Sequence, residues 1–99
     1  MAWQVTWSPA ARLDLHEIFA YIAEDDPVAA GTFLRSLFVA VARLPDFPES
    51  GRMVPEFDDP TIREIIRRPC RIVYRINVGD GTIEIVRVWH AARGTPTLW

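Results

Sequence analysis

The stretch IREIIRRPCRIVYRI, residues 62–76, decides the fold of this chain. It consists of two runs rich in isoleucine, valine and tyrosine, which are residues that favour strands. Pro69 lies between the two runs and favours a turn there. The stretch therefore predicts two antiparallel strands, over about residues 62–68 and 71–77.

The second of these strands has an apolar side and a charged side. Successive side chains of a strand point to opposite faces of the sheet. Ile72, Tyr74 and Ile76 share one face, and we expect them to be buried beneath the helices that the rest of the sequence predicts. Arg71 and Arg75 should project outward from the opposite face.

A third strand is predicted downstream, over about residues 82–89, after a turn at residues 77–81 that is rich in glycine. The three strands should form an antiparallel meander. The apolar residues of the third strand change phase along it: Ile83, Ile85, Val86 and Val88. This change predicts either a β-bulge or a strand that is partly covered on both faces.

Upstream of the meander, the sequence predicts a short strand and a helix. Trp3, Val5 and Trp7 alternate with polar residues, which indicates a half-buried strand. Ser8 followed by Pro9 favours a helix start, because serine caps a free N–H group and proline has none to leave unpaired. The apolar stripe expected for this helix is Ala11, Leu15, Ile18, Phe19 and Ile22, with Arg12, Asp14 and Glu17 away from it.

A second helix is predicted between the capping signal Asp25-Asp26-Pro27 and Pro45. Its expected buried stripe is Ala30, Phe33, Leu34, Leu37, Val41 and Leu44. Because only about two residues separate the helices, they should pack as an antiparallel hairpin. The sequence thus predicts an α+β fold in which this hairpin packs on an antiparallel sheet.

The segment PDFPESGRMVPEFDDPT, residues 45–61, connects the second helix to the meander and contains four prolines. It shows no sustained hydrophobic period, and it is longer than the roughly 12–15 residues usual for structureless loops. We expect this connection to be functional or tightly tethered.

Composition restricts the class of protein. The 99 residues, 49% hydrophobic and 24% charged, are typical of one globular domain over residues 1–99. No apolar run approaches the roughly 18–20 residues that span a bilayer, and the start MAWQVTWSP does not resemble a secretion signal. One cysteine excludes an internal disulfide and a cysteine-based metal cluster. We expect a cytoplasmic protein without a metal, a cofactor or membrane association.

Positive charge is concentrated in the second half of the chain, although the net charge is -2. Residues 1–50 carry three Arg against seven Asp or Glu, and residues 51–99 carry eight Arg against six. All 11 cations are arginine, so no lysine is available for chemistry. The five cations of the opening stretch are Arg63, Arg67, Arg68, Arg71 and Arg75.

The stretch VWHAARGTPTLW, from residue 88, adds two further candidates to this basic region. His90 ends the predicted third strand and Arg93 follows three residues later, beside strands that already project Arg71 and Arg75. Such a cleft suits an anion. The alternative interpretation is a set of solvated arginines and a hydrogen-bonded histidine in the core.

The phrases SPAARLDLHEIFAYIAEDDPVAA, GRMVPEF, IREI, RIVYRI and VRVWHAAR occur in an order and spacing that resembles the ParE/RelE superfamily of bacterial toxins. The most specific parts are Gly51-Arg52 with Pro55-Glu56, Ile62-Arg63-Glu64, Arg71 to Arg75, and His90-Ala91-Ala92-Arg93. The resemblance covers nearly the whole chain. It implies a β-α-α-β-β-β fold and a growth-inhibiting toxin of a type II toxin–antitoxin pair, held inactive by its antitoxin.

Two activities occur in this superfamily: the ParE branch is associated with poisoning of DNA gyrase, and the RelE branch cuts messenger RNA on the ribosome without a metal. Such cleavage needs groups that transfer protons, together with cations that stabilise the phosphorane. By resemblance, Arg71 matches a phosphate-binding arginine of the RelE branch. Lysines of that branch would fall near Ile62 and Glu64, a later arginine near Ala91, and a tyrosine near Thr97. The RelE-type set is therefore mostly absent.

The sequence favours a ParE-like toxin that acts by binding, with no catalytic residue, with DNA gyrase as target and with an antitoxin as partner. The residues expected to bind the target or an anion are Arg63, Arg67, Arg71, Arg75, His90 and Arg93, and those expected to contact the antitoxin are Leu98 and Trp99. One alternative is a ribosome-dependent endoribonuclease that uses Arg71, His90 and Glu64. Another is a non-toxic domain that binds a partner and regulates transcription with it. We expect no sequence-specific DNA binding by this chain alone.

Overall fold

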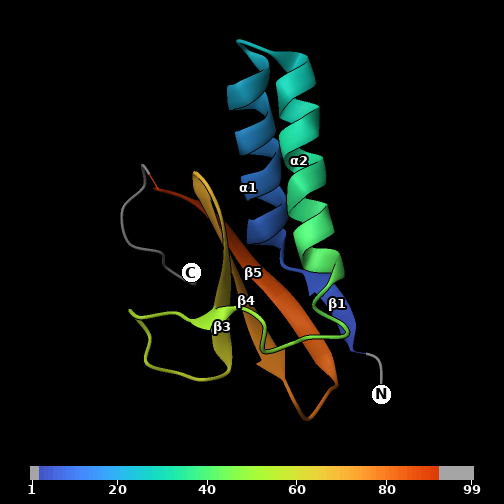
Figure 1. Ribbon diagram of the computed structural model, residues 1–99, viewed down its shortest axis with the longest axis vertical. Coiled ribbons are helices and arrows are strands. Elements are labelled where there is room, and N and C mark those ends of the chain that lie inside the picture. The colour runs from blue at the N-terminus through green and yellow to red at the C-terminus, as the bar shows by residue number, and fades with distance from the viewer. Residues whose placement is uncertain (1–2, 92–99) are drawn as a thin grey trace.

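The computed structural model describes residues 3–91 as two helices and a five-stranded sheet (Figure 1). The elements in chain order are β1 (Gln4–Trp7), α1 (Pro9–Ala23), α2 (Pro27–Ala42), β2 (Arg52–Met53), β3 (Ile62–Arg67), β4 (Cys70–Asn77) and β5 (Thr82–His90). The predicted α+β fold is confirmed. The three strands of the meander begin and end within about one residue of the predicted positions.

Both helices begin at the capping residues that the sequence predicts. The hydroxyl oxygen of Ser8 accepts the N–H of Ala11 at 3.0 Å. A carboxylate oxygen of Asp26 accepts the N–H groups of Val28 and Ala29, each at 3.1 Å. These bonds satisfy N–H groups that have no partner inside the helix, so each cap defines where its helix starts.

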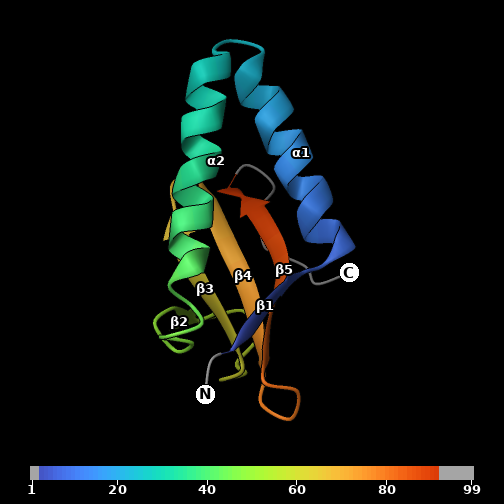
Figure 2. The same ribbon diagram turned by 90° about the vertical axis from the view of Figure 1, so that its right-hand side faces the viewer.

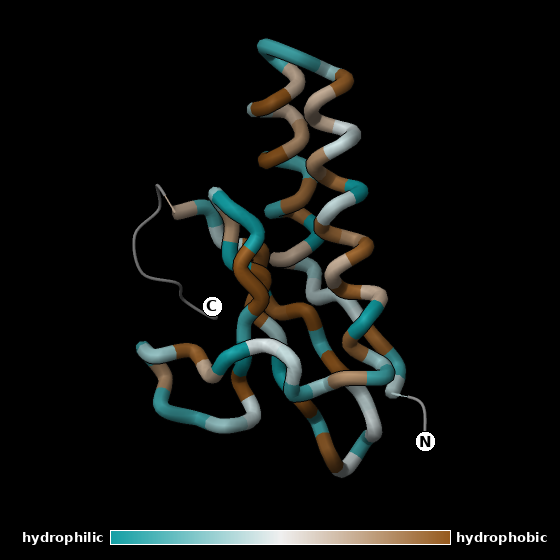
Figure 3. The backbone as a smooth tube through the Cα atoms, in the orientation of Figure 1, coloured by the Kyte–Doolittle hydropathy of each residue, from teal (hydrophilic) through white to brown (hydrophobic). Residues whose placement is uncertain are grey.

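The helices form the predicted antiparallel hairpin, which lies along one face of the sheet and projects beyond one end of it (Figures 1 and 2). The structure is elongated as a result, with extents of 42 × 27 × 21 Å. The turn at the tip of the hairpin is hydrophilic, whereas the strands that run beneath the hairpin are strongly apolar (Figure 3). Neither helix within residues 3–91 is long and apolar enough to cross a membrane.

The strand order is β1-β5-β4-β3-β2, and β3, β4 and β5 form the predicted antiparallel meander. Two features extend it. β1 pairs in parallel with β5, with Gln4 opposite Thr82 and Trp7 opposite Ile85, so the sheet is mixed. β2, a two-residue strand inside segment 45–61, pairs with β3. The sequence did not predict either pairing, because the partners are far apart along the chain or too short to show a period.

The phase change in β5 is a β-bulge. Tyr74 lies opposite Ile85, whereas the preceding residue of β4 lies opposite Arg87, so Val86 is the extra residue. The carbonyl of Val86 accepts a hydrogen bond from the Ser8 hydroxyl at 2.7 Å. Ser8 therefore caps α1 and also donates to the carbonyl of the bulged residue, and this hydrogen bond attaches the start of the helix to the sheet.

The sheet has two faces, and the helices cover one of them. We call the face beneath α1 and α2 the helix face and the opposite one the outer face. Ile72, Tyr74 and Ile76 are buried on the helix face, as predicted. The whole core cluster there is Ala11, Ile18, Leu37, Ala40, Val41, Leu44, Cys70, Ile72, Tyr74, Ile76, Ile83, Ile85 and Val88.

Two residues of α1 differ from the predicted stripe. Phe19 is 39% exposed, and Asp14, which was expected on the polar side, is only 2% exposed. Asp14 lies three residues after Ala11 and four before Ile18, so helical geometry places it on the buried stripe. The prediction was wrong because it judged the position by the charge of the side chain.

The outer face is also covered in part. Val54 and Phe57 of segment 45–61 pack on Ile62 and Val73, which forms a second, smaller core. Arg71 and Arg75 project from the same face of β4, as predicted, and are only partly buried. Segment 45–61 therefore covers part of the outer face of the sheet.

Segment 45–61 is tethered from the helix face as well. The buried hydroxyl of Tyr74 donates to the carbonyl of Pro48 at 2.7 Å and accepts the N–H of Gly51 at 3.0 Å. A Cβ atom at Gly51 would lie 2.5 Å from the carbonyl oxygen of Glu64 and 2.7 Å from the Tyr74 hydroxyl. Only glycine lets the backbone approach β3 this closely, so the predicted tethering is confirmed at this point.

Candidate functional site

A buried carboxylate organises the arginines of the outer face. The Glu64 side chain is fully buried on β3. One carboxylate oxygen accepts the Nε–H of Arg52 at 2.6 Å, and the other accepts the Nε–H of Arg71 at 2.5 Å. Charge-assisted hydrogen bonds of this kind hold a guanidinium in one orientation. Glu64 thus connects β2, β3 and β4 on one face.

A second carboxylate completes the coordination of Arg71. The two Nη groups of Arg71 donate to the two oxygens of Glu56, at 2.8 and 3.0 Å. The bidentate bond lowers the pKa of Glu56 and raises the pKa of Arg71. Glu56 remains accessible, with a side chain that is 31% exposed, so this pair lies at the surface.

Beside this network lies an open hollow of about 540 Å³, which we call the arginine cleft. Its lining consists of Arg52, Ile66, Arg68, Pro69, Cys70, Arg71 and Ala91. Arg52 and Arg68 are exposed, and the Arg52 side chain is 60% accessible although Glu64 holds its Nε. Within the part of the chain that the structure describes, the cleft therefore presents guanidinium groups from three separate segments to solvent, on a wall that is otherwise apolar.

The arginines expected to bind a target do not form one surface. Arg63 and Arg67 point to the helix-face side of β3, because the residues that alternate with them, Glu64 and Ile66, lie on the outer face. Arg63 donates to two backbone carbonyls and approaches Glu49 at 3.5 Å.

Arg75 lies on the outer face outside the arginine cleft and approaches Glu84 at 3.6 Å. Of the predicted residues that lie within residues 3–91, only Arg71 lines the cleft.

His90 does not join Arg71. It lies opposite Cys70 in the β4–β5 register, one position after the pair formed by Arg71 and Trp89, so it points to the helix face. There it contacts the ring of Tyr21, with ring centroids 6.3 Å apart. His90 and Arg71 therefore lie on opposite faces of the sheet and do not share the cleft that the sequence predicted for them.

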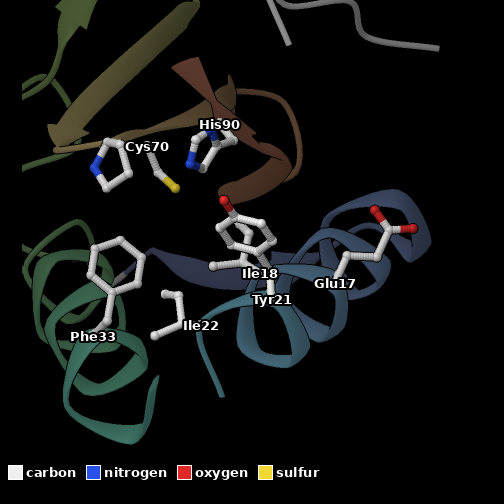
Figure 4. Close-up of a pocket in the computed structure, with 8 residues that line it drawn as sticks. Glu17, Ile18, Tyr21, Ile22, Phe33, Cys70 and His90 are labelled. Carbon is white, nitrogen blue, oxygen red and sulfur yellow. The ribbon is translucent and has the colours of Figure 1, made fainter. Parts of the chain in front are cut away.

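The helix face ends in a second hollow, which we call the apolar pocket, between the projecting hairpin and the end of the sheet (Figure 4). Its volume is about 440 Å³, and its lining consists of Glu17, Ile18, Tyr21, Ile22, Phe33, Pro69, Cys70 and His90. The helices extend past the last strand residues here, so their apolar side chains are not covered by the sheet.

Three predicted site residues, Arg93, Leu98 and Trp99, lie outside the described residues. The site residues expected from the sequence did not include Arg52, Arg68 or Glu56, which belong to the arginine cleft or hold it. A signal was available for two of them, since Arg52 and Glu56 lie within the phrase GRMVPEF that carries the family resemblance.

Comparisons with known proteins agree on the family. The family described as ParE toxin of the type II toxin–antitoxin system parDE matches residues 5–94. Toxin RelE2 of Caulobacter vibrioides is 38% identical over 90 residues, which are 91% of this chain and 97% of that protein. The protein Y4kP of Sinorhizobium fredii, named as a toxin, is 34% identical over 97 residues, or 96% of this chain and 95% of that one.

A solved structure shares the fold. The chromosomal ParDE toxin–antitoxin system from P. aeruginosa contains a chain with a TM-score of 0.72 and 22% identity, which covers 90% of this chain and 96% of that one. The matching family is named for ParE, whereas the 38% identical relative is named for RelE. This chain belongs to the ParE toxin family of type II toxin–antitoxin systems, within the ParE/RelE superfamily.

Proposed function

We propose that this toxin inhibits growth by binding DNA gyrase, and that a cognate antitoxin holds it inactive. The observation that carries the first part is the separation of His90 from Arg71 on opposite faces of the sheet. A nuclease that works without a metal needs a proton donor and acceptor at the phosphate that its cations hold. Separated groups cannot act on one phosphate.

The groups nearest to Arg71 support the same conclusion. Glu56 and Glu64 both have carboxylate oxygens that accept guanidinium hydrogen bonds. Arginine itself stays protonated and does not transfer protons at neutral pH. The chain has no lysine, and residues 92–99 contain no histidine, tyrosine or acidic residue. The arginines of such a set can stabilise bound negative charge, while both carboxylates are engaged by guanidinium groups.

Gyrase is proposed as the target because the ParE branch is associated with it and the chain belongs to the ParE family. The second candidate is a ribosome-dependent endoribonuclease. It is favoured by the 38% identity to a protein named RelE2 and by Arg71, which by resemblance matches a phosphate-binding arginine of that branch.

Expression of the toxin without its antitoxin separates these candidates. Binding of gyrase should give growth arrest with a loss of normal DNA supercoiling and with intact transcripts. His90→Ala should then leave toxicity largely unchanged, whereas in a nuclease it should reduce RNA cleavage by about 10²- to 10⁴-fold. Ribosome-dependent cuts that vanish in His90→Ala would establish the nuclease instead.

The apolar pocket supports the proposal of an antitoxin partner. Its apolar side chains from α1 and α2 remain accessible, and Tyr21 is 69% exposed at its edge (Figure 4). A pocket of this size accepts a bulky apolar side chain from a bound peptide or helix. The P. aeruginosa relative is itself part of a toxin–antitoxin system. We assign the pocket to an apolar anchor residue of the antitoxin.

Tyr21→Ala tests this assignment without a threat to the core, because the side chain is largely exposed. It should weaken antitoxin binding in a titration by about 1–3 kcal/mol, the usual cost of truncating an anchoring contact. Val28→Ala is the matched control, since Val28 is 77% exposed and lies outside the pocket. Equal affinities of the two variants would remove the pocket from the antitoxin interface.

A further inference from the structure

We propose that the antitoxin segment bound at the apolar pocket is a helix that carries a basic residue one turn before and one turn after its apolar anchor. These two cations pair with Glu17 and Glu24, which flank the edge of the pocket along α1. The inference rests on the proposed antitoxin partner, and it deepens that proposal by naming the chemistry of the bound segment.

One side of α1 presents an acidic stripe beside the apolar pocket. Glu17, Tyr21 and Glu24 are four and three residues apart, a spacing that places side chains on one face of a helix. All three are exposed, and Tyr21 lies between the two acidic residues at the edge of the pocket. Glu24 is the C-cap residue of α1 and has helical backbone angles, so the stripe continues to the end of the helix. An occupant of the pocket therefore has an acidic residue on either side of it along α1.

The hairpin sequence around this stripe contains no lysine or arginine. Residues 13–34 include five acidic residues and one histidine. Arg87 on the sheet interacts electrostatically with Glu17, but its guanidinium is bonded to Asp14 and is largely buried. The C-terminal end of α1 adds partial negative charge beside Glu24. This surface therefore favours a cation that approaches from solvent.

The pocket itself selects an apolar anchor, so the charges of the partner belong at its rim. Its lining includes the apolar side chains Ile18, Ile22, Phe33 and Pro69. Glu17 lies at one end of the lining, with its carboxylate directed away from these side chains (Figure 4). An ammonium or guanidinium group inside the pocket would lose its hydration without meeting a carboxylate. The basic residues must therefore come from the turns next to the anchor.

A helix matches this arrangement of one pocket and two acidic residues. Glu17 and Glu24 are seven residues apart, which corresponds to about 10 Å along the axis of α1. On a partner helix that packs beside α1, the residues one turn before and one turn after the anchor span about the same distance. Both ion pairs can therefore form in the position in which the anchor fills the pocket.

The sheet wall of the pocket has the opposite charge, which determines how the segment is oriented. Arg67 lies opposite Cys70 in the β3–β4 register, and Cys70 lies opposite His90 in the β4–β5 register. The three residues therefore share the helix face at this end of the sheet. A basic residue directed at this wall would be repelled by Arg67, so the cations of the partner must face α1.

The test uses the full chain and three synthetic helical peptides, which differ only at the positions one turn before and after a central leucine. These two positions are both lysine, both glutamine or both glutamate, and fluorescence anisotropy measures the affinity of each labelled peptide. At low salt, the lysine peptide should bind about three- to tenfold more tightly than the glutamine peptide, and the glutamate peptide should bind most weakly. Salt at about 1 M should bring the three affinities together, because it screens exposed charges. Equal affinities at low salt would overturn the inference.

Two double variants of the toxin assign the effect to the stripe. Glu17→Gln combined with Glu24→Gln should remove the preference for the lysine peptide and leave the affinity for the glutamine peptide unchanged. Asp46→Asn combined with Asp80→Asn makes the same change in charge at exposed residues outside the pocket, and it should leave the preference intact. Equal losses of preference in the two double variants would show an effect of net charge, which would overturn the role of the stripe.

Tyr21→Ala separates this inference from the proposed function. It should weaken binding of the glutamine peptide as well as the lysine peptide, because it removes the edge of the pocket. If the three peptides bind equally and respond to Tyr21→Ala, the pocket accepts an anchor and only the basic flanks are wrong. If the lysine peptide fails to bind, or binds without a response to Tyr21→Ala, the inference and the assignment of the pocket both fail.

Discussion

Two carboxylates are almost completely buried among residues 3–91, and the fold uses them in different ways. Asp14 on α1 accepts two hydrogen bonds from Arg87, at 2.8 and 2.9 Å, and the N–H of Val88 at 2.9 Å. Glu64 on β3 accepts Nε–H groups from two arginines of the outer face. One carboxylate joins a helix to a sheet, and the other positions a surface.

The two carboxylates differ in how far the arginine that each one binds is exposed to solvent. The Arg87 side chain is 13% exposed, and its guanidinium stacks over the ring of Trp89 at 4.8 Å. Its hydrogen-bonding capacity is directed at the scaffold, and this bonding to Asp14 raises the pKa of Arg87. Arg52 is 60% exposed despite its bond to Glu64. A buried carboxylate can thus either hold an arginine within the core or orient an arginine that stays accessible to a ligand.

The location of Asp14 explains its role. β1 ends at Trp7, opposite Ile85, so from Val86 onward the outer edge of β5 has no strand partner within the described residues. Asp14 covers this edge by accepting the backbone N–H of Val88. An uncovered edge with a buried N–H would cost free energy, and a carboxylate on the adjacent helix removes that cost.

The largest expected effect comes from breaking the scaffold pair. Asp14→Ala leaves Arg87 and the Val88 N–H without their acceptor in a buried position, which should lower the free energy of unfolding by about 3–5 kcal/mol. Urea denaturation measures the change. Asp25→Ala, at the exposed tip of the hairpin, is the control and should change stability by less than about 0.5 kcal/mol. Similar losses in both variants would show that the buried pair contributes nothing specific.

A smaller loss should follow Glu64→Gln. Arg71 keeps its bidentate bond to Glu56, and Arg52 is already largely accessible to water. The expected cost is about 1–3 kcal/mol, from one imperfectly paired guanidinium at a buried site. Glu24→Gln at the exposed end of α1 serves as the control. A loss as large as that of Asp14→Ala would contradict the distinction between scaffold and site.

Tyr74→Phe asks whether neutral hydrogen bonds hold segment 45–61 independently of Glu64. The variant removes the partner of the Pro48 carbonyl and of the Gly51 N–H, which should cost about 1–2 kcal/mol. Tyr21→Phe is the control because Tyr21 is largely exposed. Additive losses in the double variant with Glu64→Gln would show two independent attachments.

The same tyrosine predicts a response to alkaline pH. Burial raises the pKa of Tyr74, so the folded state keeps this proton after the unfolded state has lost it. The stabilisation is complete below the pKa of the unfolded tyrosine, about 10, and is lost as the pH rises through the folded value. Stability should therefore decline above about pH 10, and more steeply in the wild type than in Tyr74→Phe.

The smallest effect is expected for Glu56→Gln, and it should depend on pH. The bond from Arg71 lowers the pKa of Glu56, so its stabilisation is present above the ordinary pKa of about 4.3 and is lost as the pH falls through the folded value. The difference between wild type and variant should be at most about 1 kcal/mol near neutrality. A difference that persists at strongly acidic pH would exclude the ion pair as its cause.

The sequence by itself determined most of the architecture. Period-2 alternation in residues 62–76 and 82–89 defined the meander, and the caps at Ser8 and Asp26 defined both helix starts. These signals are local, because strand alternation and helix capping depend on neighbouring residues. The break in the alternation of β5 was also visible, and the structure shows that of the two explanations it left open, a bulge or a strand covered on both faces, the bulge is present. The family resemblance was carried by the same segments.

Only the tertiary structure decided which charged groups meet. Asp14 and Arg87 are 73 residues apart in sequence. Glu64, Arg52 and Arg71 come from three different strands, and Glu64 accepts a hydrogen bond from each of the two arginines. The sequence grouped His90 with Arg71 because both belong to basic segments, yet the β4–β5 register places them on opposite faces. A one-residue change of register reverses the face of every side chain, and no local pattern of charges determines that register.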